Sequence, residues 1–168
     1  MKFEQLFESE TEVVYRGLEQ EFNINEHNNS NVIFVTPSIE LATAYSDSPD
    51  HVYKFEVVLG RGFNFGFRTL STEVKWDDIQ SRLQRGIMSA YTDKQIDKET
   101  AMQLYDVLDT GGNKTKMVAA WKWYMSVPLI CDVLRKAGYD HIVGYEGSNN
   151  NIIAYGVLYP ENLKRLNP

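Results

Sequence analysis

Strand-like segments lie towards both ends of this chain, and helical patterns lie between them. The segments that predict strands cover residues 12–16, 32–35, 51–59, 63–67, 139–145 and 152–159. Residues of about 70–137 instead repeat apolar side chains at helical spacing. Strands and helices that are segregated along a chain are typical of an α+β fold. The 168 residues suffice for one domain, predicted over 11–168, with a helical insert at about 70–137.

Two of the predicted strands end in polar groups. The first ends in Arg16-Gly17, and the second ends in Thr36-Pro37-Ser38, where Thr36 is the expected N-cap of a helix. A buried arginine is costly unless it meets an anion or a carboxylate. Hydroxyls and free backbone N–H groups at a helix start favour anions. The pair predicts a cleft for a phosphorylated ligand; the alternative is an arginine paired with a structural carboxylate beside an ordinary helix cap.

Composition argues against several classes of protein. The net charge of −6, with scattered basic residues, disfavours non-specific nucleic-acid binding. We expect no membrane segment and no signal peptide, because no apolar run is long enough. Cys131 lies in an apolar helical pattern and is expected to be a buried hydrophobe. The three histidines are far apart in sequence, so no metal site is predicted.

Local signals place several element boundaries. A capping box over Thr92–Gln95 predicts the start of a helix that runs to about Leu108. A further helix is expected over Met117–Met125, and Ser126 is expected to cap the next helix, which Gly138 closes. Gly60-Arg61-Gly62 is interpreted as a bulge in a strand. Pro160–Lys164 is expected to form a turn with a short helical piece.

Four motifs occur in a familiar order. They are Tyr15-Arg16-Gly17, Phe34-Val35-Thr36-Pro37 followed by Ala42-Thr43-Ala44-Tyr45, Ala137-Gly138-Tyr139-Asp140-His141-Ile142-Val143, and the run from Ala154 to Lys164. In these motifs the chain resembles the ADP-ribosyltransferase family, in the divergent form found in phage-encoded and toxin domains. The resemblance implies a split mixed and antiparallel β-sheet core. The helical residues of about 70–125 have no counterpart in it.

The resemblance implies NAD as a co-substrate and no metal. Arg16, with Gly17, would contact the NAD phosphates. Thr36, or Ser38 as the second choice, would position the ribose and the arginine. Tyr45 would stack on the nicotinamide ring, which agrees with the attraction of a cationic ring to an aromatic face.

The chain departs from the family at the catalytic acid. The family's glutamate opens the last strand, and the aligned residue here is Ala154. A carboxylate is needed to stabilise the positive charge that develops on the ribose. The nearest acid before it is Glu146, expected at the start of a flexible polar loop over 146–151. Glu146 is therefore the candidate catalytic acid, with Arg16 and Thr36; the alternative is a solvated loop carboxylate.

Residues 1–10 form a short acidic stretch. Leu6-Phe7-Glu8 resembles the cleavage pattern of the delivery peptides of tailed-phage head proteins. The expected function is mono-ADP-ribosylation of a host protein or nucleic acid in the bacterial cytoplasm. The alternatives are a catalytically inactive binding module of the same fold and an internal protein packaged in a phage virion.

Overall fold

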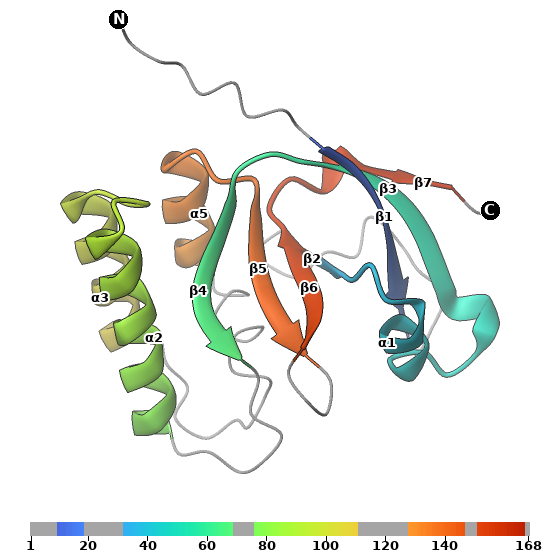
Figure 1. Ribbon diagram of the computed structural model, residues 1–168, viewed down its shortest axis with the longest axis horizontal. Coiled ribbons are helices and arrows are strands. Elements are labelled where there is room, and N and C mark those ends of the chain that lie inside the picture. The colour runs from blue at the N-terminus through green and yellow to red at the C-terminus, as the bar shows by residue number, and fades with distance from the viewer. Residues whose placement is uncertain (1–9, 19–31, 69–75, 111–127, 147–150, 167–168) are drawn as a thin grey trace, which may run out of the picture.

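Two β-sheets pack against one another in the computed structural model of the protein (Figure 1). The structure describes residues 10–18, 32–68, 76–110, 128–146 and 151–166. The first sheet is antiparallel, in the order β1 (Glu10–Gly17), β3 (Val52–Leu59) and β7 (Leu163–Arg165). The second has the order β2 (Ile33–Val35), β6 (Ile152–Val157), β5 (His141–Glu146) and β4 (Gly62–Arg68). Only its β4–β5 pair is parallel, and the predicted α+β class is confirmed.

The core between the sheets follows from alternation along the strands. In β3, Tyr53, Phe55 and Val57 are buried, whereas Lys54 and Val58 on the other face are exposed. The buried face meets β-branched residues of β2 and β6. Period-two patterning therefore gives this sheet one core face and one solvent face.

Helices cover the other side of the second sheet. They are α2 (Trp76–Thr92), α3 (Lys98–Thr110) and α5 (Pro128–Lys136). Their apolar faces form a second core with Phe63 of β4, Ile142 of β5 and Ala154 of β6. A short helix, α1 (Ile39–Ala44), lies apart from them at the end of β1 (Figure 1). Cys131 of α5 is fully buried, as predicted.

The helix boundaries correct one prediction and confirm another. The helix start predicted over Thr92–Gln95 is wrong, because α2 continues to Thr92 and Lys94 then takes a positive φ of 58°. The α3 helix begins later, where the Asp97 carboxylate accepts a hydrogen bond from the Thr100 N–H at 2.8 Å. Gly138 closes α5 with a φ of 82°, as expected of a residue that must be left-handed.

The segment Gly60-Arg61-Gly62 is not a bulge. It carries the chain from β3 in the first sheet to β4 in the second. The Arg61 guanidinium fixes this crossing, because it donates to the carbonyl oxygens of Gln95 at 2.7 Å and Ala137 at 3.0 Å. It also lies 4.2 Å from the centroid of the Tyr139 ring.

The chain end contains a strand that sequence patterns did not indicate. The expected helical piece is present as the 3₁₀ turn Pro160–Asn162, and β7 follows it directly and pairs with β3. The predicted helix over Met117–Met125, the Ser126 cap and the possible delivery segment lie outside the described residues, except for Glu10, which begins β1. None of the described helices has the length and hydropathy needed to span a membrane.

Candidate functional site

A cavity of about 610 Å³ opens where the two sheets meet. The meeting point is a bridge between Tyr15 of β1 and Thr36, with N–H···O distances of 2.7 and 2.9 Å. The cavity brings together Arg16, Gly17, Thr36, Tyr45 and Glu146, which are all of the predicted site residues except Ser38. The other lining residues are Tyr15, Leu18, Phe34, Val35, Leu41, Ala42 and Ala154.

Arg16 links the two sheets at the cavity wall. Its Nη1 donates to the carbonyl oxygen of Phe34 in β2 at 3.3 Å. Burial lowers the pKa of Arg16 to about 10, so the guanidinium stays protonated at neutral pH. A half-buried positive charge that lines an open cavity attracts an anionic ligand.

Thr36 is buried and fully engaged with the backbone. Its hydroxyl donates to the carbonyl oxygen of Ile153 at 2.7 Å and accepts from the Ser38 N–H at 3.1 Å. The first of these bonds extends the pairing of β2 with β6 beyond Val35. As arranged, the hydroxyl hydrogen holds the cavity wall together and is not directed at a ligand.

The expected N-cap of α1 is wrong by two residues. Thr36 still pairs with Tyr15 as a strand residue, so the helix cannot begin there. Ser38 is the N-cap instead: its hydroxyl oxygen accepts from the Leu41 N–H at 3.1 Å, and its O–H donates to the Glu40 carboxylate at 3.0 Å. In this capping position Ser38 is not among the residues that line the cavity.

Glu146 is not a solvated loop residue. It is the last residue of β5, because the β5–β6 pairing continues to Glu146 opposite Ile152. The residue is only 2 % exposed. Its Oε2 accepts a hydrogen bond of 2.5 Å from the hydroxyl of Tyr45, the residue that follows α1.

Tyr45 forms the C-cap of α1 and is about half exposed. Burial raises the pKa of Tyr45, and the hydrogen bond to Glu146 and the negative charge of Glu146 raise it further. The hydroxyl therefore keeps its proton at neutral pH and acts as the donor to the carboxylate. The sequence did not predict this contact between an acid of β5 and the tyrosine that caps α1.

Ala154 and Glu146 share one face of the β5–β6 pair. Ala154 lies opposite Gly144, and Glu146 lies two residues further along β5. Diagonal neighbours of this kind are typically about 7–8 Å apart. Glu146 therefore supplies a carboxylate next to the position that the resemblance assigns to the acid. The turn-forming residues Gly147 to Asn151 are the sequence signal that favours a hairpin between these two strands.

Among the described residues, no group of three or more His, Cys, Asp or Glu side chains could hold a metal ion. No protein-family model matches the chain, and no curated protein matches it. A solved structure, described as the crystal structure of an anti-CRISPR protein, is similar to it with a TM-score of 0.45 and 10 % sequence identity. That alignment covers 96 % of this chain and 99 % of the other chain.

Proposed function

We propose that the protein is an NAD-dependent ADP-ribosyltransferase that modifies a macromolecule of a bacterial host, either a protein or a nucleic acid. One observation carries the proposal: Arg16, Tyr45 and a buried carboxylate, Glu146, line the same cavity. The two sheets separate beside the Tyr15–Thr36 bridge. This arrangement supports the split-sheet core that the resemblance implies.

The groups of the cavity suit NAD. A volume of about 610 Å³ falls within the range usual for small-molecule sites. The Arg16 guanidinium would bind the pyrophosphate, which it can contact through two parallel hydrogen bonds. The half-exposed ring of Tyr45 would lie against the cationic nicotinamide. Thr36 would keep β2 in place against β6.

NAD supplies the ADP-ribosyl group for transfer. The bond between the ribose C1′ and nicotinamide breaks, and its electron pair leaves with nicotinamide, which becomes neutral. A nucleophile of the acceptor forms the new bond to C1′ and releases its proton. Glu146 would stabilise the positive charge that develops on the ribose, as carboxylates do in glycoside hydrolysis.

Nicotinamide release and transfer of label test the proposal. The full chain would be incubated with NAD labelled in the adenylate part and a bacterial lysate. We expect free nicotinamide and a labelled protein or nucleic acid. Glu146→Gln, which keeps the size of the side chain, should lower release by about 10²-fold or more while the protein still binds NAD.

Matched controls separate failure of chemistry from failure of folding. Glu161→Gln removes an exposed carboxylate from the 3₁₀ turn Pro160–Asn162 and should leave release unchanged. Circular dichroism and thermal unfolding would show that each variant is folded. Absence of both nicotinamide release and a thermal shift at millimolar NAD would refute the proposal, because even a weak site stabilises the folded state.

A catalytically inactive binding module is the second candidate. Ala154 favours it, because this position in β6 lines the cavity and carries no carboxylate. This candidate predicts a thermal shift with NAD but no nicotinamide release in any lysate. The two functions are thus separated by one pair of measurements on the unmodified protein.

A further inference from the structure

The carboxylate of Glu146 is held by a side chain from a different part of the fold. Glu146 belongs to β5, whereas Tyr45, whose hydroxyl lies 2.5 Å from Glu146 Oε2, follows α1 and is 101 residues away in sequence. Glu146 is almost completely buried, and burying a carboxyl group is costly unless it is hydrogen-bonded. The Tyr45 hydroxyl supplies a charge-assisted hydrogen bond.

Helix α1 is a fixed support for Tyr45. Its start is capped by Ser38, and the segment after it is tied to the end of β1. The Leu18 N–H donates to the His51 carbonyl oxygen at 3.1 Å, and the Asp47 N–H donates to the Leu18 carbonyl oxygen at 3.3 Å.

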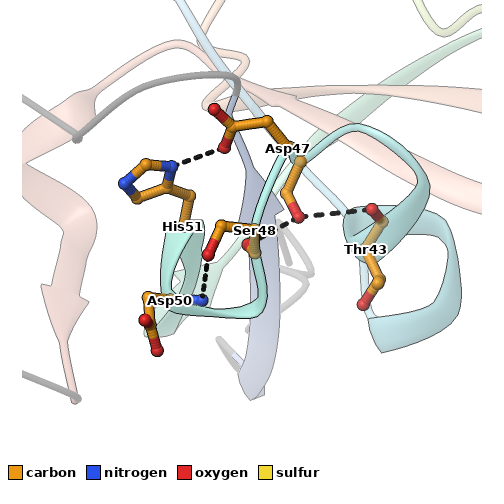
Figure 2. A network of polar contacts seen from close by, with 6 residues as sticks. Thr43, Asp47, Ser48, Asp50 and His51 are labelled. Atoms are coloured by element: carbon orange, nitrogen blue, oxygen red, sulfur yellow. Dashed lines mark hydrogen bonds and ion pairs between the residues drawn. The ribbon is translucent and has the colours of Figure 1, made fainter.

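Side chains reinforce the same segment, as Figure 2 shows. His51 Nδ1 lies 2.5 Å from Asp47 Oδ1, and the Ser48 hydroxyl oxygen accepts from the Asp50 N–H at 3.2 Å. The Ser46 hydroxyl donates to the Ser48 carbonyl oxygen at 2.9 Å. A side chain that is supported in this way can fix the position of its partner.

We propose that the hydroxyl of Tyr45 is a positioning group, which orients the Glu146 carboxylate in the cavity for the chemical step. This inference rests on the proposed function. It gives Tyr45 two separable roles: the ring contacts the nicotinamide, and the hydroxyl acts on the reaction only through Glu146. The hydroxyl therefore affects kcat, whereas the ring affects the KM for NAD.

Tyr45→Phe separates the two roles, because it removes one oxygen atom and keeps the ring. Steady-state nicotinamide release would give kcat and KM for NAD, and calorimetry would give the Kd. We expect kcat to fall about 10- to 100-fold, which corresponds to a hydrogen bond to a charged group. KM and Kd should change by less than about threefold. Tyr45→Ala, which also removes the ring, should raise KM.

A double-mutant cycle shows whether the effect passes through Glu146. In the Glu146→Gln background, Tyr45→Phe should have little further effect on the residual kcat. Glu146→Asp shortens the side chain and so removes the carboxylate from the same hydrogen bond. In that background, too, Tyr45→Phe should lower kcat little further. Tyr91→Phe, at a similarly exposed tyrosine of α2, is the control and should leave kcat unchanged.

Each outcome bears on one of the two claims. An unmodified protein that releases no nicotinamide overturns the proposed function, and with it this inference. An active protein whose kcat is unaffected by Tyr45→Phe overturns the positioning role alone. The positioning role is also overturned if Tyr45→Phe lowers kcat equally in the native protein and in the Glu146→Gln background. Should Tyr45→Phe not fold, an unchanged kcat in Glu146→Asp, which breaks the same hydrogen bond, overturns the positioning role.

Discussion

A Cβ atom on Gly17 would lie 1.7 Å from the carbonyl oxygen of Ala42, because β1 ends directly against the backbone of α1. Glycine is therefore the residue that permits this approach, and its role is steric. The approach sets the distance between Arg16, on β1, and Tyr45, at the end of α1.

We expect Gly17→Ala to move α1 and to destabilise the protein by about 1–3 kcal/mol, the usual cost of overpacking. The backbone oxygen of Ala42 cannot move alone, so NAD affinity should fall as well. Urea unfolding and calorimetry would measure the two effects. Gly156→Ala is a milder control, because a Cβ atom there would first meet the Phe34 side chain at 3.1 Å. Equal stability of Gly17→Ala and the native protein would contradict the steric role.

The charge of Arg16 predicts how the affinity for NAD depends on pH. Burial lowers the pKa of Arg16 to about 10, so its charge is present below that pH and is lost as the pH rises through it. The Kd for NAD should be constant between about pH 7 and about pH 9 and should increase above about pH 10. Calorimetric titrations across this range would check it. Arg16→Gln should bind weakly at every pH; an unchanged Kd in this variant would exclude Arg16 from the site.

Thr36 offers a test of the cavity wall. Thr36→Val keeps the shape of the side chain but leaves the Ile153 carbonyl oxygen without that hydrogen bond. We expect a loss of about 1–3 kcal/mol in the free energy of unfolding. Thr36→Ser, which keeps the hydroxyl, should lose less. A larger effect of Thr36→Val on NAD affinity than on stability would instead indicate direct contact with the ligand.

Arg61 should contribute to the free energy of unfolding and not to NAD binding. Its guanidinium donates to two carbonyl oxygens and to the Tyr139 hydroxyl, and it does not line the cavity. Arg61→Lys cannot reproduce this planar arrangement and should cost about 1–3 kcal/mol of stability. Chemical denaturation would measure the loss. The Kd for NAD should stay as it is; a marked change in Kd would contradict this division.

The neighbouring positions of Glu146 and Ala154 allow the acid to be moved. Glu146→Ala should abolish nicotinamide release, and adding Ala154→Glu to it should restore part of the release, because both side chains lie on the same face of β5 and β6. Ala154→Gln in the same background is the matched control for side-chain volume. Equal activity of the Glu and Gln versions would show that position 154 cannot serve the reaction.

The sequence allowed most strands to be predicted, because their patterning directly reflects which face is buried. The alternation in residues 52–58 is an example, and the predicted bounds of β3 agree closely with the structure. Short elements were harder. β7 has three residues, and only its pairing with β3 makes it a strand.

The sequence indicates most of the residues that the cavity brings together, but not the contact between Tyr45 and Glu146. Arg16 and Tyr45 were expected from their motifs, and both line the cavity. The burial of Glu146 could not be deduced from its neighbours, since a glutamate beside glycine and asparagines is typical of an exposed loop. Its environment is set by strand register and by Tyr45, a residue far away in the chain.

The shared face of Glu146 and Ala154 also affects how distant relatives of such a chain would be compared. An alignment column records a place along one strand, whereas a ligand meets a place in space that two adjacent strands can both reach. Position 154 on β6 is an alanine, yet the cavity that it lines also holds the carboxylate of Glu146, which comes from the neighbouring strand β5. A missing residue in one column is therefore not evidence of lost chemistry until the neighbouring strand has been inspected.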